Sequence, residues 1–235
     1  MNEENTEEDF IPIDTTIVKG DLSRKQRDEI LEGIKNKAFG LDLETGGLDY
    51  NTTDIKLATL IDYTSNKVFI IRTHKNKKPP ANLIEILKQD VNIVYHHVMF
   101  DNRFIYKHWG IVPTEEGHTD MARLFSPVRT KLACTKIIAK IIDPNRSSYS
   151  LKDLVKDYLE VDISKDYGEG SWDDDELSDQ QIQYCIDDVA YLSELLQAMM
   201  KDSTLEQQQK IMRYNWLVPA EVRRQVDNEP HPLEY

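Results

Sequence analysis

Residues 38–45 read AFGLDLET, a stretch in which hydrophobic and acidic residues alternate. Hydrophobic side chains at positions 39, 41 and 43 alternate with Asp42 and Glu44, which is the two-residue period of a strand with one buried face. Gly46 and Gly47 follow directly and end the strand in a turn. We therefore predict a core strand whose two carboxylates project from the face opposite the buried side chains.

Two carboxylates on one face of a strand repel each other unless a cation lies between them. Hard oxygen ligands of this kind suit Mg²⁺ or Mn²⁺. The alternative interpretation is a solvent-exposed strand face that carries two surface acids. Asp42 and Glu44 alone leave both interpretations open.

The surrounding segments predict a mixed sheet flanked by helices. Further strands are expected at residues 55–61 and 68–71, joined by a turn at 64–66, and together with the strand that begins at residue 38 they form an antiparallel trio. A fourth strand is expected at residues 92–95. Helices are expected at residues 21–35, 80–89, 98–109, 119–125, 131–142, 150–159, 179–201 and 203–217. Strands followed by a mainly helical remainder indicate the α/β class.

We expect three regions along the chain. Residues 1–15 are predicted to form a disordered acidic tail, residues 16–202 the main domain, and residues 203–235 a C-terminal helix and tail. Prolines at positions 219, 230 and 232 are expected to break that tail.

The chain has 235 residues, 40% of them hydrophobic, and a net charge of −13. This composition describes one well-buried soluble domain, and no apolar run approaches the roughly 18 residues of a membrane span. The acidic N-terminus differs from a secretory signal. Cys134 and Cys185 lie far apart without a CxxC pairing, so we expect buried thiols in a cytoplasmic protein that does not bind membranes. The acidic charge argues against a long nucleic-acid track.

A further acid follows the short strand predicted at 92–95. Residues 96–101 read HHVMFD, so Asp101 falls in the first turns of a helix near the carboxyl end of that strand, where ligand sites gather. A charge that complements the helix dipole is the alternative interpretation. For His96 and His97, packing or capping is favoured over zinc ligation, because no HExxH motif or Cys/His cluster accompanies them.

A predicted helix begins at Ser178, where Ser178 and Gln181 form a capping box. Its hydrophobic stripe has helical spacing, and Asp188 lies at the edge of the stripe with Tyr184 one turn before it. Asp187 is predicted to lie opposite the stripe, in solvent. The geometry therefore favours Asp188 over Asp187 as a ligand and makes Tyr184 its companion.

Together these segments resemble the DEDDy-type 3′→5′ exonucleases of the RNase D group. The similarity covers roughly residues 36–200. The family patterns D-x-E-T, H-N-x-x-F-D and Y-x-x-x-D are similar to DLETGGLD at 42–49, HHVMFD at 96–101 and YCIDDVAYL at 184–192. The segments between these motifs are also similar, at residues 150–154, Lys165 and Ser171-Trp172.

Some of the linking sequence is similar to the subgroup called nanoRNase C, which degrades very short RNAs. CTKI at 134–137 and VDISK at 161–165 carry this similarity. Two features depart from the family pattern: His97 replaces an Asn, and residues 120–150 are longer than the RNase D pattern. Thr119-Asp120-Met121 and Cys134-Thr135-Lys136 are alternative matches to an intermediate motif.

The resemblance implies an RNase H-like fold, with a mixed five-stranded sheet flanked by helices as in DnaQ-like exonucleases. It also implies two divalent cations, Mg²⁺ or Mn²⁺. Asp42, Glu44 and Asp188 would hold one cation, and Asp42 would bridge to the second, which Asp101 supports. Tyr184 would position or deprotonate the attacking water. These five residues are the expected catalytic residues.

The resemblance further implies a substrate, which is the 3′ end of a single-stranded nucleic acid. Short RNA is favoured, with 5′-mononucleotides as the product. Lys165 is expected to contact a phosphate, and Trp172 is expected either to stack on a base or to lie in the core. The expected substrate contacts are Thr45, Leu48, His97, Phe100, Lys165 and Trp172.

Other interpretations remain open. A DNA exonuclease, free-standing or proofreading, would carry the same carboxylates, and nothing in the sequence distinguishes recognition of a 2′-hydroxyl. A catalytically inactive exonuclease fold could serve as an interaction module, although all four acids and the tyrosine are present. The basic run at 74–78 is expected to be a solvated loop rather than a phosphate track. A homo-oligomer is neither indicated nor excluded.

Overall fold

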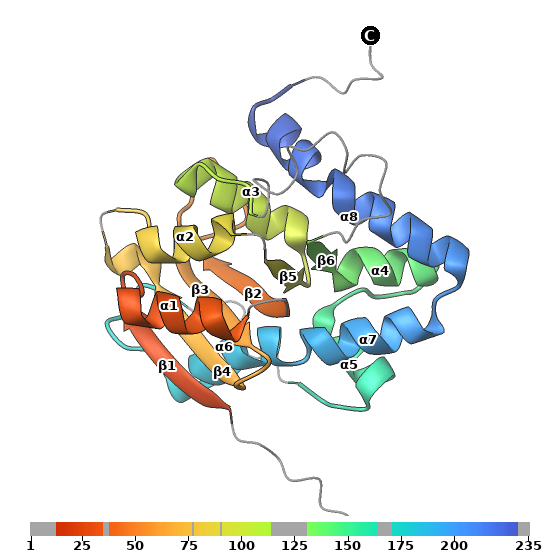
Figure 1. Cartoon of the computed structure of the whole chain (residues 1–235), viewed down its shortest axis with the longest axis horizontal. Coiled ribbons are helices and arrows are strands. Elements are labelled where there is room, and N and C mark those ends of the chain that lie inside the picture. Colours follow the sequence, from red (N-terminus) through yellow and green to blue (C-terminus); the bar gives the residue numbers. More distant parts are fainter. Residues whose placement is uncertain are drawn as a thin grey trace, which may run out of the picture.

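The computed structural model describes residues 13–34, 38–76, 78–89, 91–113, 131–163 and 171–229. They form a mixed six-stranded sheet in the order β1-β4-β3-β2-β5-β6, with helices packed on it (Figure 1). The strands are β1 (Asp14–Lys19), β2 (Ala38–Thr45), β3 (Ile55–Asp62), β4 (Lys67–Arg72), β5 (Asn92–Tyr95) and β6 (Leu132–Cys134). β3 pairs antiparallel with β2 and β4, as predicted, and the other pairs are parallel.

The helices include the predicted ones at 21–35, 80–89 and 150–159, within narrower limits, and the one at 98–109 with the predicted limits. Their bounds are α1 (Arg24–Gly33), α2 (Ala81–Lys88), α3 (Val98–Trp109), α4 (Thr135–Ile142), α5 (Leu151–Leu159), α6 (Asp179–Ala190), α7 (Leu192–Asp202) and α8 (Leu205–Val226). A short 3₁₀ turn, η1 (Thr73–Lys75), follows β4. None of the described helices is both long enough and apolar enough to cross a membrane.

The inner strand β2 separates two hydrophobic layers. Its apolar side chains at 39, 41 and 43 are buried and pack with α1, α2 and α3 on one face of the sheet. On the opposite face, Leu57 and Ile61 of β3 pack with Cys185 and Val189 of α6. The predicted alternation of β2 is therefore confirmed, and it leaves the two acids of the strand on the face that α6 covers.

Gly40 provides space for a tyrosine that links the sheet to α6. A Cβ atom at residue 40 would lie 2.3 Å from the Oη atom of Tyr63, so a larger residue requires a shift. Tyr63 donates a hydrogen bond of 2.9 Å to the carbonyl oxygen of Val189. Because α6 ends at Ala190, this bond ties the end of the helix to the sheet.

Two strands were missing from the four that were predicted by residue range, and the sheet has six strands rather than the five that the resemblance implied. β1 begins at Asp14, inside the predicted tail of residues 1–15, and it forms by parallel pairing with the distant β4. The apolar run at 131–142 was predicted as one helix but is β6 followed by α4, because Leu132 and Cys134 pair with β5 and are buried there. A short apolar run fits a strand or a helix equally well. Residues 1–12 and the helix predicted at 119–125 lie outside the described residues.

The helix predicted at 179–201 is two helices, α6 and α7, which meet at Tyr191. The Val189 carbonyl oxygen accepts the Tyr63 hydroxyl at this junction. Helical periodicity does not record such a tertiary contact, so the break could not be predicted from it.

The C-terminal helix α8 extends to Val226 and continues through Pro219, so the expected break at this proline was wrong. A proline inside a helix removes one backbone hydrogen bond. Val218 and Val222 are buried beside α3 in the main hydrophobic core, and this packing offsets the lost bond.

We expect Gly40→Ala to destabilise the protein by about 1–3 kcal/mol, because the new methyl group overpacks the contact with Tyr63. In thermal unfolding this corresponds to a decrease in Tm of about 2–12 °C. The double variant Gly40→Ala/Tyr63→Phe lacks the crowded hydroxyl and should regain part of the loss. Equal Tm values for wild type and Gly40→Ala would show that Tyr63 moves aside without cost.

Candidate active site

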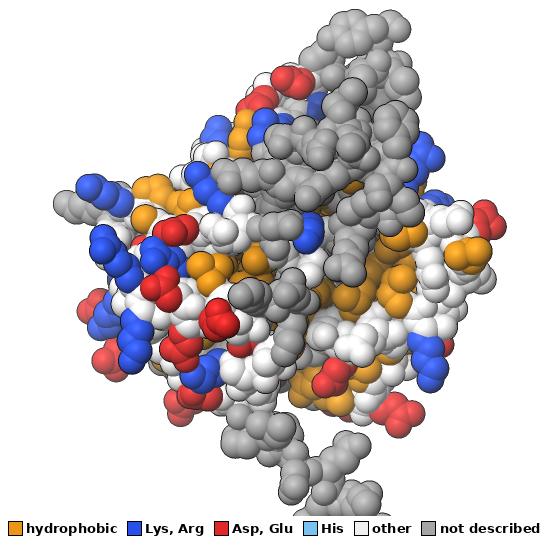
Figure 2. Space-filling model, in the orientation of Figure 1, with side chains coloured by type: hydrophobic (Ala, Val, Ile, Leu, Met, Phe, Trp, Pro, Cys, Tyr) orange, Lys and Arg blue, Asp and Glu red, His pale blue; other side chains and the backbone are white. Residues whose placement is uncertain are grey.

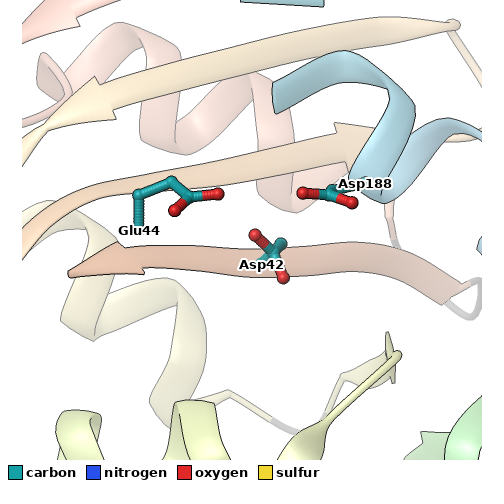
Figure 3. A group of neighbouring side chains, drawn as sticks. All are labelled: Asp42, Glu44 and Asp188. Carbon is teal, nitrogen blue, oxygen red and sulfur yellow. The ribbon is translucent and has the colours of Figure 1, made fainter. Parts of the chain in front are cut away.

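Three carboxylates from β2 and α6 meet over the sheet. Asp42 and Glu44 project from β2, and Asp188 points toward them from α6 (Figure 3). One oxygen atom of each carboxylate lies within 4.8 Å of the other two. A single divalent cation can bridge oxygen ligands at this separation. The predicted common face of the two strand acids is therefore confirmed, and so is the choice of Asp188 as the acid of α6 that faces them.

The packing of α6 fixes the direction of Asp188. The predicted capping box at Ser178 starts the helix. Cys185 and Val189 are buried against the sheet. Residues three and four apart lie on one side of a helix, so Asp188 and Tyr184 flank this buried face and reach the space above β2.

Asp101 approaches the same space from α3. Its side chain is 1% exposed and lines the same cleft as the other acids. Its Oδ1 atom is buried without a hydrogen-bond partner, a cost that a bound water or cation would offset. Burial is the main cause that raises the pKa of Asp101 to about 8. Asp101 lies in the first turn of α3, but its burial differs from that of a solvent-exposed charge at a helix end.

Burial and mutual repulsion raise the pKa values of the strand acids. For Asp42 and Glu44, burial is the largest cause and the negative charge of Asp188 is the next. Ionising the whole group without a cation is therefore costly, and a divalent cation would offset both causes. The residues present fit a site for a hard cation with oxygen ligands.

Tyr184 lies beside these acids. Its hydroxyl group hydrogen-bonds Asp188, and its ring centroid lies 6.1 Å from that of Trp172. Burial raises the pKa of Tyr184, and the nearby carboxylates raise it further. The phenol is therefore protonated at neutral pH.

A cleft with a volume of about 590 Å³ contains this group of side chains. The predicted site residues that line it are Asp42, Glu44, Thr45, Leu48, His97, Phe100, Asp101, Trp172, Tyr184 and Asp188. Five further residues line it that were not predicted as contacts, namely Leu43, Gly46, Gly47, His96 and Leu151. The glycine pair directly after Thr45 was a signal for two of them, whereas nothing local to Leu151 indicates its place in the cleft.

The rim of the cleft offers flat and apolar surfaces. Leu48 is 86% exposed although it is a large hydrophobic residue. Thr45 donates a hydrogen bond of 2.6 Å from its Oγ1 atom to the carbonyl oxygen of Gly47, which holds the turn before Leu48. His97 and Phe100 stack with ring centroids 6.0 Å apart and planes at 21°.

Trp172 and His96 are packed residues. Trp172 is 4% exposed among hydrophobic side chains of α6 and the sheet, so the core alternative is confirmed, and the same residue forms part of the cleft wall. The Nδ1 atom of His96 lies 2.9 Å from the Oγ1 atom of Thr135, and its Nε2 atom lies 3.0 Å from the carbonyl oxygen of Tyr149. Packing was the favoured interpretation of His96 and is confirmed.

Asp187 was expected in solvent, and this prediction was wrong. Its side chain is 8% exposed and accepts a hydrogen bond of 2.8 Å from the Nε2 atom of Gln183. Burial raises the pKa of Asp187. The helical period gives the direction of a side chain but not what covers it. Asp187 does not line the cleft, so the preference for Asp188 as the residue of the site is unaffected.

The segment Cys134-Thr135-Lys136 lies against the second motif. The Sγ atom of Cys134 and the backbone nitrogen of Lys136 donate to the carbonyl oxygen of His96 at 3.1 and 3.3 Å. This alternative for the intermediate motif therefore contacts a residue that lines the cleft. The other alternative, residues 119–121, lies outside the described residues, as does Lys165, whose phosphate contact stays a prediction.

A family model described as 3′-5′ exonuclease matches residues 22–203 of the chain. The matched range contains every strand from β2 to β6 and all the acids of the cleft. The chain belongs to the 3′-5′ exonuclease family. The exonuclease activity expected from the motifs is thereby confirmed. A comparison with curated proteins gives no significant match.

Solved nucleases share the fold of this exonuclease. NrnC of Brucella melitensis with bound Mg²⁺ is 21% identical over 94% of this chain and 99% of its own, with a TM-score of 0.73. NrnC bound to pGG is 21% identical over 95% of this chain and 100% of its own, with a TM-score of 0.74. Escherichia coli RNase D is 17% identical over 89% of this chain and 51% of its own, with a TM-score of 0.67. These similarities confirm the RNase H-like, DnaQ-like fold.

We expect the pH dependence of stability in the metal-free exonuclease to depend on Asp101. An acid with a raised pKa stabilises the folded state fully below its unfolded pKa of about 4, and this contribution is lost as the pH rises through the folded pKa. For Asp101 the loss therefore falls between about pH 4 and its folded pKa of about 8.

Asp101→Asn should flatten this part of the stability profile. Each unit of pKa difference corresponds to about 1.4 kcal/mol, or about 3–6 °C in Tm for a protein of this size. The measurement is scanning calorimetry of both proteins in EDTA from pH 5 to pH 8, repeated with Mn²⁺. Added Mn²⁺ should raise the Tm of the wild type most at pH 8. Parallel profiles for the two proteins would contradict the assignment.

Proposed function

We propose that this exonuclease hydrolyses single-stranded RNA from its 3′ end, releases 5′-mononucleotides and uses two divalent cations, Mg²⁺ or Mn²⁺. The observation that carries the proposal is the convergence of Asp42, Glu44 and Asp188 within 4.8 Å in a cleft that buried Asp101 also lines. Acids this crowded ionise together only beside a cation. The same cation would allow an anionic phosphodiester to approach them.

The carboxylates would share the cations between them. We assign Asp42, Glu44 and Asp188 to one cation and Asp42 with Asp101 to the other. When bound, the cations would stabilise the attacking hydroxide and the departing 3′ oxygen, which remains on the shortened strand. The Mg²⁺ bound to NrnC supports the choice of a hard cation.

Tyr184 would orient the attacking water. Its hydroxyl group hydrogen-bonds Asp188, and the residue lines the cleft. Burial is the largest cause of its raised pKa, which disfavours the phenolate form that would be needed to remove a proton from water. Of the two roles expected from the sequence, we therefore favour positioning of the water over its deprotonation.

The size and rim of the cleft favour a short single strand. Its volume of about 590 Å³ falls within the range of about 300–1,000 Å³ of small-ligand sites. The exposed side chain of Leu48 and the stacked rings of His97 and Phe100 offer surfaces on which unpaired bases can stack. The bases of a duplex already stack on each other and are not available for such contacts.

The charge distribution also favours a short substrate. The chain has a net charge of −13. On the face drawn in Figure 2, the Lys and Arg side chains of the described residues are interspersed with Asp and Glu rather than forming one continuous band. In the basic run at 74–78, the Nδ1 atom of His74 lies 2.6 Å from the carbonyl oxygen of Lys56. The Nζ atom of Lys75 lies 3.0 Å from the carbonyl oxygen of Asp173. These contacts orient the two side chains toward the protein's own backbone, which leaves fewer partners for a long phosphate track.

The comparisons support RNA over DNA. NrnC is bound to pGG in one structure, and Escherichia coli RNase D is an exoribonuclease involved in structured RNA processing. We extend this substrate class to the present chain. The free, buried thiols of Cys134 and Cys185 support a reducing, cytoplasmic location.

We expect Asp188→Asn to lower kcat on a 5′-labelled RNA oligomer by at least several hundred-fold, on the order of losing one electrostatic contact to the transition state. The neighbouring Asp187→Asn is the matched control. It changes an acid of the same helix that does not line the cleft, and asparagine can still accept the bond from Gln183, so kcat should stay within about threefold. Comparable losses in both variants would contradict the assignment of Asp188.

We expect short RNA to be hydrolysed at least as well as long RNA, because the acidic surface offers few phosphate contacts beyond the cleft. The measurement is kcat/KM for a dinucleotide, a heptamer and a thirty-mer at two salt concentrations, in RNA and DNA series. The salt dependence should be shallow, and the RNA series should exceed the DNA series. A steep increase with length and a strong salt slope would favour processive trimming or proofreading.

A further inference from the structure

Trp172 lines the cleft from a segment that is neither helix nor strand. This segment, residues 171–175, precedes α6. The ring of Trp172 is packed at 6.1 Å and 44° to the ring of Tyr184, and it also contacts the hydrophobic layer that contains Cys185 and Val189. The position of Trp172 therefore affects the position of Tyr184.

Arg72, a residue of the sheet, anchors this segment through hydrogen bonds. It is the last residue of β4 and is 1% exposed. Its Nη1 and Nη2 atoms donate hydrogen bonds to the carbonyl oxygens of Asp175 and Asp174, and its Nε atom is buried without a partner. A buried guanidinium costs free energy unless its donors are satisfied. Arg72 and the segment therefore constrain each other.

A lysine and a glutamine add two further contacts, one on each side of Trp172. The Nζ atom of Lys56 on β3 lies 2.7 Å from the Oδ1 atom of Asp173. Gln181 of α6 is 3% exposed and donates a hydrogen bond of 2.8 Å from its Nε2 atom to the carbonyl oxygen of Ser171. The backbone on both sides of the indole is thus tied to the sheet or to α6.

These contacts also offset the charge of the segment. Residues 173–176 read DDDE, and their side chains are exposed. Neighbouring negative charges repel each other and favour an extended chain. Lys56, Arg72 and Lys75 bring three positive charges to this segment from the sheet and the turn that follows it. These positive charges therefore stabilise the packing of the acidic segment against the protein.

We propose that Arg72 is a positioning residue for hydrolysis. It holds residues 171–175 on the sheet, the segment holds Trp172 against Tyr184, and the Tyr184 hydroxyl group is kept beside Asp188. Arg72 does not line the cleft, so it acts through Trp172 and not on the substrate. The proposal rests on the role proposed above for Tyr184.

The test compares wild type, Arg72→Lys, Tyr184→Phe and the double variant. Lysine keeps the charge but lacks the fork that donates to two carbonyl oxygens at once. We expect Arg72→Lys to lower kcat by about 10- to 100-fold, with KM within about twofold of wild type. In the Tyr184→Phe background the same change should alter kcat by less than about twofold. An equal factor in both backgrounds would indicate a merely structural role and would overturn the proposal.

Lys67→Met is the matched control. Lys67 begins the same strand, and its Nζ atom lies 2.5 Å from the Oε1 atom of Glu29, away from the cleft. We expect its kcat to equal that of wild type, and a loss similar to that of Arg72→Lys would count against the proposal.

If Arg72→Lys does not fold, Lys56→Met replaces it in the same set of four proteins. Its expected loss of kcat must likewise disappear in the Tyr184→Phe background.

The fluorescence of Trp172 tests the positioning without any nuclease assay. The chain has three tryptophans, so Trp109→Phe/Trp216→Phe leaves Trp172 as the only one. Arg72→Lys should then shift the emission to longer wavelength and increase quenching by iodide, because the indole leaves its buried position. An unchanged spectrum would overturn the proposal. A shifted spectrum in a protein without nuclease activity would support the contact of Arg72 and contradict the proposed function instead.

Discussion

The carboxylates of Asp42, Glu44 and Asp188 are held side by side by the fold, and their negative charges repel one another. Asp42 and Glu44 cannot turn to another face, because the residues that alternate with them at positions 39, 41 and 43 form the core side of β2. Burial and the charge of Asp188 raise the pKa values of both acids. Packing elsewhere must therefore supply the free energy that keeps the group together. Such an unfavourable cluster in a cleft is typical of a site that binds cations for catalysis.

Contacts from the antiparallel part of the sheet keep α6 in place over this cluster. Gly40 gives space to Tyr63, whose hydroxyl group binds the end of the helix. Near its beginning, Arg72 holds the segment that carries Trp172. In the parallel part of the sheet, β5 is followed by α3, and the first turn of this helix places Asp101 at the cleft from the other side. The site thus lies where the two parts of the sheet meet.

The acids of the site could be predicted because each lies in a segment with a local pattern. The alternation of β2 and the capping box at Ser178 set the directions of their side chains without reference to the rest of the fold. Features that depend on distant partners could not be predicted in this way. The short strands β1 and β6 form by pairing with remote strands, and the break at Tyr191 coincides with a bond from Tyr63. Arg72 bonds a residue 103 positions further along the chain, which no local pattern records.

A crystal structure of the wild-type protein soaked in Mn²⁺, with anomalous scattering measured to locate the metal, tests directly whether these carboxylates bind divalent cations. We expect an anomalous peak bound by oxygen atoms of Asp42, Glu44 and Asp188, at metal–oxygen distances of about 2.0–2.6 Å. A second peak should lie between Asp42 and Asp101. Clear density for the four side chains without any anomalous peak among them would contradict the claim that their repulsion is relieved by divalent cations.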